Sequence, residues 1–321
     1  MTLTDQHATW FAETFRNLVA NVGQVILGKP GPISLAFTCL LSEGHLLLED
    51  FPGTGKTSLA KALAATVQGT HSRIQFTPDL LPSDVTGVEI YDQKTGLFDF
   101  HPGPIFASIV LADEINRASP KTQSALLEVM EESKVTVDRM THEVGNPFMV
   151  IATQNPIEQA GTYPLPEAQL DRFMLKTSLG YPDHASTVAI LAGSQTRRHT
   201  KTVSALITTD QVVDMVEVAA SVHVDGSILN YVAHLAEATR TSPDTTVGVS
   251  VRGCLALVRA AKTWAVSNGR AFVTPDDIKT LIEPVLAHRI LLDAESEYSG
   301  TTVHRVLSQI TSEVVPPQQR G

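Results

Sequence analysis

The sequence has few of the features that mark secreted or membrane proteins. Only two of its 321 residues are cysteines, Cys39 and Cys254, which favours free thiols in a reducing compartment over a disulfide framework. No apolar run reaches the roughly 20 residues of a membrane span. The first residues also lack the basic and apolar segments of a secretory signal. We therefore expect a cytoplasmic protein without a membrane span.

Basic charge is also scarce. The chain has 24 Lys and Arg residues against 34 Asp and Glu residues, which gives a net charge of -10. Sequence-independent binding to nucleic acid phosphates needs a basic face, so nucleic acid is not an expected partner, although a local basic groove stays compatible with this charge. The length and the hydrophobic content of 43% allow a large core and two domains.

What the chain does have is a stretch typical of a phosphate-binding loop. The apolar run Leu46–Leu48 leads into a glycine-rich turn, and a helical pattern follows. Gly53 and Gly55 let successive N–H groups point inward, Lys56 brings an ammonium group to the outer phosphates, and the Thr57 hydroxyl can ligate Mg²⁺. The residues expected to contact the phosphates are Pro52, Gly53, Thr54, Gly55, Lys56, Thr57 and Ser58.

One position departs from the strict motif, which has glycine where this chain has Asp50. A carboxylate beside a triphosphate is repulsive unless it points away. Upstream, an apolar loop over residues 25–28 ends at Gly28. This loop packs either on the adenine of a nucleotide or in the protein core, and the sequence does not choose between the two.

A second stretch carries two acids. The apolar segment 107–112 is typical of a buried parallel strand, and it ends in Asp113 and Glu114. Since parallel strands bring their carboxyl ends to one sheet edge, both acids are expected near the phosphate loop. Asp113 can hold Mg²⁺ through water, and Glu114 can orient and deprotonate an attacking water.

Two further polar residues follow apolar segments. Asn155 comes after the strand pattern 148–153, where its amide either holds the attacking water or the γ-phosphate, or simply forms a turn. Arg172 precedes a last strand pattern and is either a surface residue or a finger that reaches a neighbour's γ-phosphate.

The pattern changes near residue 180. An α/β core over residues 1–180 is expected to contain hairpins near 88–100 and 135–148, and residues 181–321 are expected to form an all-α domain. Arg252 begins one of these helices. A cation is unfavourable at a helix N-terminus, so Arg252 points either to an external anion such as a nucleotide or to a surface salt bridge.

Four segments together resemble the MoxR family of AAA+ ATPases, across nearly the whole chain. They are Asp50-Phe-Pro-Gly-Thr-Gly-Lys-Thr, Ala112-Asp-Glu-Ile-Asn-Arg-Ala, Ala152-Thr-Gln-Asn-Pro and Gly161-Thr-Tyr-Pro-Leu-Pro-Glu-Ala-Gln-Leu-Asp-Arg-Phe. The resemblance implies an AAA+ P-loop NTPase core with a parallel central sheet and a helical lid. It also implies that an acid commonly replaces the first loop glycine, as Asp50 does here.

The resemblance further implies roles for matching residues. Lys56 and Thr57 would be Walker A contacts, Asp113 and Glu114 the Walker B pair, Asn155 sensor 1, Arg172 an arginine finger acting in trans, and Arg252 sensor 2. The hairpin 88–100 would be the helix-2 insert, and the second hairpin the pre-sensor insertion. The expected activity is Mg²⁺-dependent ATP hydrolysis in a ring, commonly a hexamer. Such a ring would remodel partner proteins or load them with metal or cofactor, often proteins with von Willebrand factor A domains.

Three other functions stay open on the sequence. A DNA-directed AAA+ motor would use the hairpins on a strand, but these hairpins carry acids, which disfavours a phosphate track. A metal-chelatase motor shares the fold, and only the MoxR-like stretch after Asn155 argues against it. A nucleotide-gated scaffold that does not turn over would lack a general base, and Glu114 is present. The acids of the hairpins are Asp92, Asp99, Asp138 and Glu143.

Overall fold

The computed structural model describes residues 4–138, 140–155, 162–195 and 203–317, and the chain divides into two compact units. The first unit contains residues 17–172 and 177–213. The second contains the N-terminal residues up to 16, residues 173–176 and the chain from 214 onward. The domain boundary after residue 180 stays a prediction. Within the described ranges, no helix combines the length and the apolar character that a membrane span needs.

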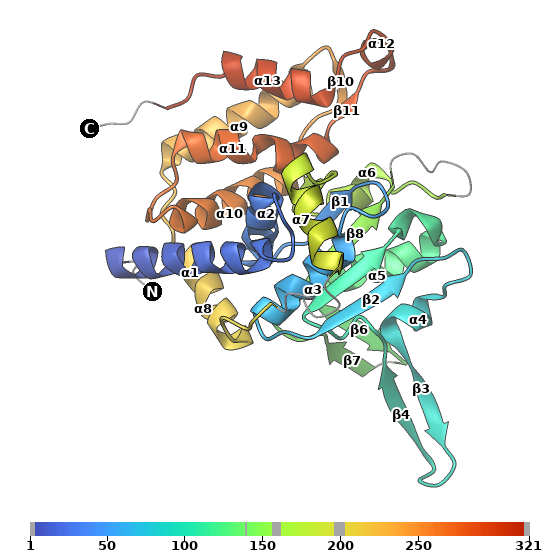
Figure 1. Cartoon of the computed structure of the whole chain (residues 1–321). Coiled ribbons are helices and arrows are strands. Elements are labelled where there is room, and N and C mark those ends of the chain that lie inside the picture. Colours follow the sequence, from blue (N-terminus) through green and yellow to red (C-terminus); the bar gives the residue numbers. More distant parts are fainter. Residues whose placement is uncertain (1–3, 139, 156–161, 196–202, 318–321) are drawn as a thin grey trace. The chain divides into compact units, whose positions relative to one another are not determined.

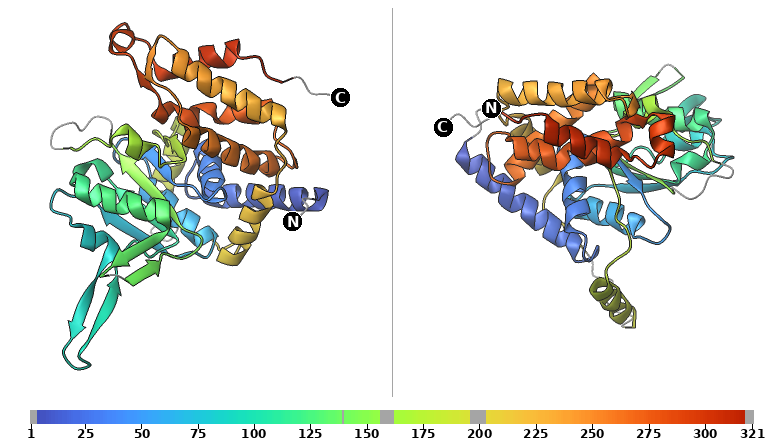
Figure 2. Two further views of the ribbon diagram at one scale, coloured as in Figure 1. Left: turned by 180° about the vertical axis from the view of Figure 1, so that it is seen from behind. Right: turned by 90° about the horizontal axis from the view of Figure 1, so that it is seen from above.

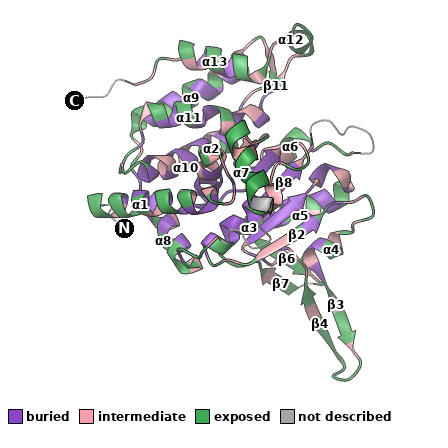
Figure 3. Ribbon diagram, in the orientation of Figure 1, coloured by how far each residue is buried: buried purple, intermediate pink, exposed green. Residues whose placement is uncertain are grey.

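A five-stranded sheet with strand order β2-β5-β8-β1-β9 forms the centre of the α/β core. Its inner strands pair in parallel. Because β5 is buried along its whole length, and β1 and β8 in all but their last residue, they carry the continuous apolar runs that the sequence showed (Figure 3). The predicted α/β class with a parallel central sheet is confirmed. The strands are β1 (Leu46–Glu49), β2 (His71–Gln75), β5 (Ile109–Asp113), β8 (Met149–Gln154) and β9 (Leu175–Thr177).

Helices accompany this sheet, as Figures 1 and 2 show. Helix α3 begins at Lys56, directly after the glycine-rich turn, and packs against β2 and β5 through its buried side chains. The free thiol of Cys39 lies buried in α2, whereas Cys254 is only partly buried. The helices are α2 (Pro30–Leu40), α3 (Lys56–Thr66), α4 (Pro82–Thr86), η1 (Ile115–Arg117), α5 (Pro120–Glu132), α6 (Glu167–Leu170) and α7 (His184–Gln195).

Two antiparallel hairpins interrupt the alternation of strands and helices. Strands β3 (Gly87–Asp92) and β4 (Leu97–Pro102) form a hairpin that extends away from the central sheet (Figure 1). Strands β6 (Lys134–Val137) and β7 (Met140–Glu143) form the second, which is shorter than the pattern 135–148 predicted. Both lie where the sequence places insertions.

The C-terminal region is helical, as predicted. Helix α11 starts with a capping box between Thr274 and Asp277, and a proline occupies its first turn. The helical patterns did not predict a small antiparallel sheet of β10 (Thr245–Val247) and β11 (Leu291–Leu292). The helices are α9 (Gly226–Thr241), α10 (Val251–Ser267), α11 (Pro275–Leu286), η2 (Ala287–Arg289), α12 (Ala294–Tyr298) and α13 (Val303–Glu313). Two more, α1 (Asp5–Gly23) and α8 (Thr209–Ala220), each contribute to both units.

Candidate active site

The glycine-rich turn between β1 and α3 has the backbone of an anion cradle. Gly53 and Gly55 have φ angles of 82° and 99°, a region that L side chains adopt only with strain. Pro52, Gly53 and Ser58 are exposed, while Thr54 and Thr57 are half-buried, so the loop is open to a ligand. The Lys56 ammonium donates to the carbonyl oxygens of Asp50 and Phe51, both at 3.2 Å. These neutral acceptors leave its charge available to a phosphate.

The contacts of Asp50 explain why an acid can occupy the position where the motif has glycine. Its carboxylate is buried and turned to the segment after β9. The backbone N–H of Leu179 donates to Oδ2 at 2.6 Å, and the N–H of Gly180 donates to Oδ1 at 2.9 Å. The Ser178 hydroxyl donates to Oδ1 at 3.0 Å. The carboxylate therefore fastens the start of the loop to residues 178–180, and its negative charge is compensated there.

The two acids at the end of β5 are held by the neighbouring strand β8. The Thr153 hydroxyl donates to Oδ1 of Asp113 at 2.7 Å, and the backbone N–H of Glu114 donates to the same hydroxyl oxygen at 2.9 Å. Asp113 is buried, whereas Glu114 is half-buried. Thr153 thus fixes the orientation of both acids, a role that its place in an apolar strand did not reveal.

Glu114 also has an unusual backbone. Its φ and ψ of 58° and 50° are left-handed, which costs free energy for a residue that is not glycine. Such strain persists only where the surroundings impose it. Here Gln75 Nε2 donates to Glu114 Oε2 at 2.9 Å, and Arg117 Nε lies 3.3 Å from the same oxygen. Residues of β2, β8 and η1 therefore all contact the two acids.

Strand β2 contributes a residue that the sequence analysis missed. The Arg73 guanidinium donates to Oδ2 of Asp113 at 2.6 Å and to Oε1 of Gln75 at 2.9 Å. Arg73 and Gln75 alternate with the buried Ile74, so both lie on one face of the strand. This alternation was a signal that could have identified them. A cation thus faces the carboxylate that is expected to face a metal ion.

Asn155 directly follows β8, whose residues pair in register with β1 and β5. The ends of these three strands carry Asp50, Asp113 and Asn155, so the predicted convergence at one sheet edge is observed. Residues 156–161, which carry part of the MoxR-like segment, lie outside the described residues.

The two predicted arginines belong to different compact units of the chain. Arg172 follows α6, and its Nε donates to Oε2 of Glu131 in α5 at 2.9 Å. Arg252 is an exposed residue in the first turn of α10, whose start is capped by the Ser250 hydroxyl. Arg252 belongs to the second compact unit, so the structure does not place it relative to the phosphate loop.

The upstream loop reaches the phosphate loop. Gly28 has a left-handed φ of 72°, and the side chain of Ile26 is buried. A methyl group added to Gly55 would lie 3.8 Å from Cδ1 of Ile26. The loop over residues 25–28 therefore lies beside the phosphate loop, where both the adenine interpretation and the core interpretation place it.

The donor set at the sheet edge fits Mg²⁺. This ion prefers oxygen ligands and keeps several waters, and Thr57 and Asp113 offer a hydroxyl and a carboxylate. In the described part of the chain, no three His, Cys, Asp or Glu side chains cluster as an all-protein metal site would require. A metal bound at this edge would therefore rely on few protein ligands together with phosphate and water.

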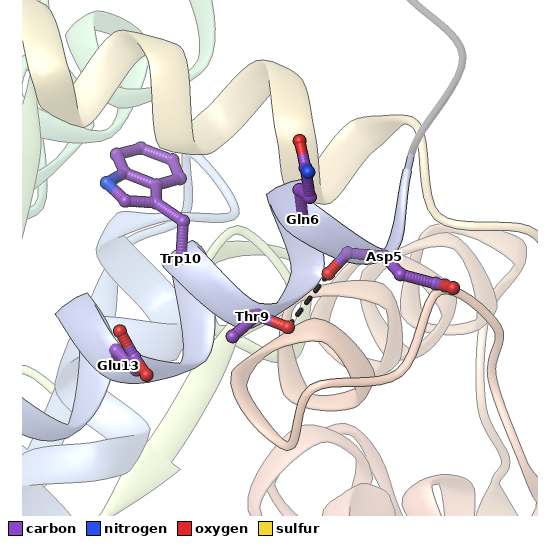
Figure 4. A pocket seen from close by; sticks show the side chains of 5 residues that line it. All are labelled: Asp5, Gln6, Thr9, Trp10 and Glu13. Atoms are coloured by element: carbon purple, nitrogen blue, oxygen red, sulfur yellow. Dashed lines mark hydrogen bonds between the residues drawn. The ribbon is translucent and has the colours of Figure 1, made fainter.

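A cavity elsewhere has the wrong chemistry for a nucleotide. It has a volume of about 370 Å³ and lies along the exposed side of α1, where Trp10 forms one wall (Figure 4). Asp5 and Glu13 line it, and no cation does so among the described residues. Phosphate groups would be repelled there. The complete lining is Asp5, Gln6, Thr9, Trp10 and Glu13.

Comparison with known proteins gives the same assignment for both parts of the chain. Residues 45–175 match the ATPase family associated with various cellular activities (AAA), and residues 237–310 match the AAA lid domain. The crystal structure of a Cytophaga hutchinsonii protein, provisionally assigned as an ATPase, is similar with a TM-score of 0.91 and 37% identity. That match covers 97% of both chains.

Relatives that match over nearly their whole length include proteins with MoxR names. Chaperone MoxR1 of Mycobacterium tuberculosis is 38% identical over 95% of this chain and 83% of its own. Protein MoxR of Paracoccus denitrificans is 31% identical over 90% of this chain and 91% of its own. The uncharacterized protein YeaC of Bacillus subtilis is 46% identical over 94% of this chain and 95% of its own.

Proposed function

Because the chain belongs to the MoxR family of AAA+ ATPases, we propose that it hydrolyses ATP at the sheet edge formed by β1, β5 and β8. One observation carries this proposal. Thr153 holds both Asp113 and Glu114 at the carboxyl end of β5, on the edge where the phosphate loop begins. A cradle for phosphates and a pair of oriented acids are the two parts that phosphoryl transfer to water requires.

The proposed roles follow from these positions. The loop N–H groups and Lys56 bind the β- and γ-phosphates, and Glu114 accepts a proton from the attacking water. Asn155 orients that water or the γ-phosphate. Mg²⁺, held by Thr57 and by Asp113 through water, would supply charge neutralisation between the phosphates when bound. We further propose that the loop around Gly28, which lies beside the phosphate loop, contacts the adenine.

We propose that Arg172 completes the site of a neighbouring subunit in a ring, commonly a hexamer in this family. Its present partner, Glu131, is on the same chain, and the pair is half-exposed. Half-exposed pairs of this kind are worth about 1 kcal/mol or less, so a γ-phosphate can outcompete Glu131. In this proposal Arg252 contacts the phosphates from the chain's own lid.

The client is proposed from the family alone. The relative named Chaperone MoxR1 supports remodelling of partner proteins, and we propose partners with von Willebrand factor A domains, with metal or cofactor loading as one outcome. The β3–β4 hairpin, which carries Glu89, Asp92 and Asp99 against Lys94, favours a protein client over a nucleic acid strand. A chelatase-type motor remains the second candidate because it would use the same core.

Mixed rings test the shared site. Subunits with Arg172→Ala keep their own general base, and subunits with Glu114→Gln keep their own finger. Interfaces that pair an intact base with an intact finger should recover part of the wild-type turnover. Verified mixed rings without any recovery would refute the proposal that Arg172 acts in trans.

A further inference from the structure

Arg289 is a buried arginine at the end of η2, with only 7% of its surface exposed. A guanidinium keeps its charge at all ordinary pH values, so its burial is costly unless its donors find acceptors. Its Nη2 donates to the carbonyl oxygen of Phe173 at 2.6 Å, and its Nη1 donates to that of Met174 at 3.3 Å. Nη1 also donates to the carbonyl of Val285.

Two of these acceptors belong to the backbone that directly follows Arg172. The neighbouring His288 adds to the contact, because its Nε2 lies 3.0 Å from the carbonyl oxygen of Phe173. Burial and the nearby Arg289 lower the pKa of His288 well below its usual value, so the imidazole stays neutral beside the guanidinium. Backbone carbonyls neither titrate nor change rotamer, so this attachment holds the chain after Arg172 to η2.

The other side of Arg289 lies against the start of α10. A methyl group added to the buried Gly253 would lie only 2.8 Å from Cδ of Arg289, so the arginine stem occupies the space of a side chain there. Gly253 is the residue after Arg252, and its N–H donates to the Ser250 hydroxyl that caps the helix. The Arg289 side chain is therefore in contact with the immediate sequence neighbours of both Arg172 and Arg252.

We propose that Arg289 is a positioning residue that joins the backbone after Arg172 to the helix start that carries Arg252. The inference rests on the proposed function, since it requires both arginines to contact phosphates. A shift of α10 caused by a phosphate at Arg252 would then move residues 173 and 174 and with them Arg172. The nucleotide bound at one site would thereby determine the position of Arg172, which acts at the next site in the ring.

The test compares Arg289→Lys with a matched control, Arg270→Lys, in the full chain. Lysine keeps the charge but cannot donate to two carbonyls in the fork geometry of arginine. Arg270 pairs with Asp277 at 2.5 Å in the same compact unit and contacts neither Phe173 nor Gly253 in the interactions described for it. We measure kcat and KM for ATP, the Kd of a non-hydrolysable ATP analogue and the folded fraction, alone and combined with Arg172→Ala.

We expect Arg289→Lys to lower kcat at least about tenfold per folded molecule while the analogue Kd changes less than about twofold, because a misplaced group costs turnover before it costs binding. Arg270→Lys should leave kcat per folded molecule unchanged. In the Arg172→Ala background, Arg289→Lys should cause no further loss. If the two losses multiply instead, or if both lysine variants lose activity only in proportion to unfolded protein, the inference is wrong.

Failure of the proposed function has its own signature. If Arg172→Ala alone leaves kcat unchanged, both the proposal that Arg172 acts in trans and this inference are wrong. If Arg172→Ala lowers kcat but Arg289→Lys does not, only the inference is wrong. Should Arg289→Lys not fold, Gly253→Ala takes its place, because its added methyl group displaces the Arg289 stem. The same loss of kcat without loss of analogue binding is then expected, and an unchanged kcat would overturn the inference.

Discussion

The Asp50 carboxylate accepts a hydrogen bond of 2.6 Å from the backbone N–H of Leu179, which lies 129 residues further along the chain. A second N–H, from Gly180, donates to its other oxygen. The residue that replaces the first glycine of the phosphate loop therefore faces away from the phosphates. It anchors the loop to the segment after the last strand of the sheet.

Replacing Asp50 by glycine would restore the generic loop sequence and remove this anchor. The buried N–H of Leu179 and the part-buried N–H of Gly180 would lose a charged acceptor, so we expect the free energy of unfolding to fall by about 2–4 kcal/mol. Asp50→Asn keeps one acceptor oxygen, so its free energy of unfolding should lie between those of the wild type and Asp50→Gly. Denaturant titration measures the change, and an Asp50→Gly protein as stable as the wild type would show that the anchor does not stabilise the fold.

Arg73 faces the carboxylate proposed to lie near Mg²⁺, and it should compete with the metal. The pair is partly exposed, which limits its worth to about 1 kcal/mol. We therefore expect Arg73→Met to lower the Mg²⁺ concentration for half-maximal turnover by up to about fivefold. The control is Arg117→Met, which removes the contact of Arg117 with Glu114. It should leave the Mg²⁺ concentration for half-maximal turnover unchanged. A higher Mg²⁺ requirement in Arg73→Met would mean that Arg73 prepares the metal site.

Two phenylalanines of the β3–β4 hairpin should respond differently to the same substitution. Phe98 is 67% exposed at the far end of the hairpin, whereas the Phe100 ring stacks on His142 with centroids 3.8 Å apart. We expect Phe98→Ser to change the free energy of unfolding by less than about 0.5 kcal/mol. Phe100→Ser should cost at least about 1 kcal/mol, since it removes a ring stack and buried area. Equal losses would show that the contact between the exposed Phe98 and Tyr91 rings, whose centroids are 5.3 Å apart, stabilises the protein as much as the Phe100 stack does.

The buried His288 should make stability depend on pH. Its pKa is lowered in the folded state by burial and by Arg289, while in the unfolded chain it titrates near its ordinary value of about 6.5. The unfolded state therefore takes up a proton as the pH falls below about 6.5, and the folded state does not. Stability is complete above this pH and declines below it, by up to about 1.4 kcal/mol per pH unit.

Denaturant unfolding at pH 7.5 and pH 5.5 measures this decline. The His288→Gln variant should lose less stability between the two values than the wild type does. His71 has its pKa lowered in the same direction, by burial first and by Lys61 second, so His71→Gln serves as the comparison for a less buried histidine. A wild-type decline that His288→Gln reproduces in full would assign the pH dependence to other groups.

The features predicted correctly from the sequence are those coded by neighbouring residues. The glycine-rich turn between β1 and α3 and the apolar strand that ends in Asp113 each depend on a few consecutive side chains, and the structure has both. The contacts of Thr153 and Arg73 could not be predicted because each joins two different strands. The sequence of one strand does not determine its register with its neighbour. The β10–β11 sheet was not predicted because strands of two or three residues are too short to show an alternation of apolar and polar residues.

The most direct test of the account is the specific rate of ATP turnover as a function of protein concentration, with Glu114→Gln as the control and the molar mass measured by light scattering in ATP. We predict that the rate per chain rises as a ring assembles and that Glu114→Gln assembles but does not turn over. A protein that stays monomeric and hydrolyses ATP at the same specific rate at every concentration would contradict the shared site, and Arg172 would then be a structural partner of Glu131.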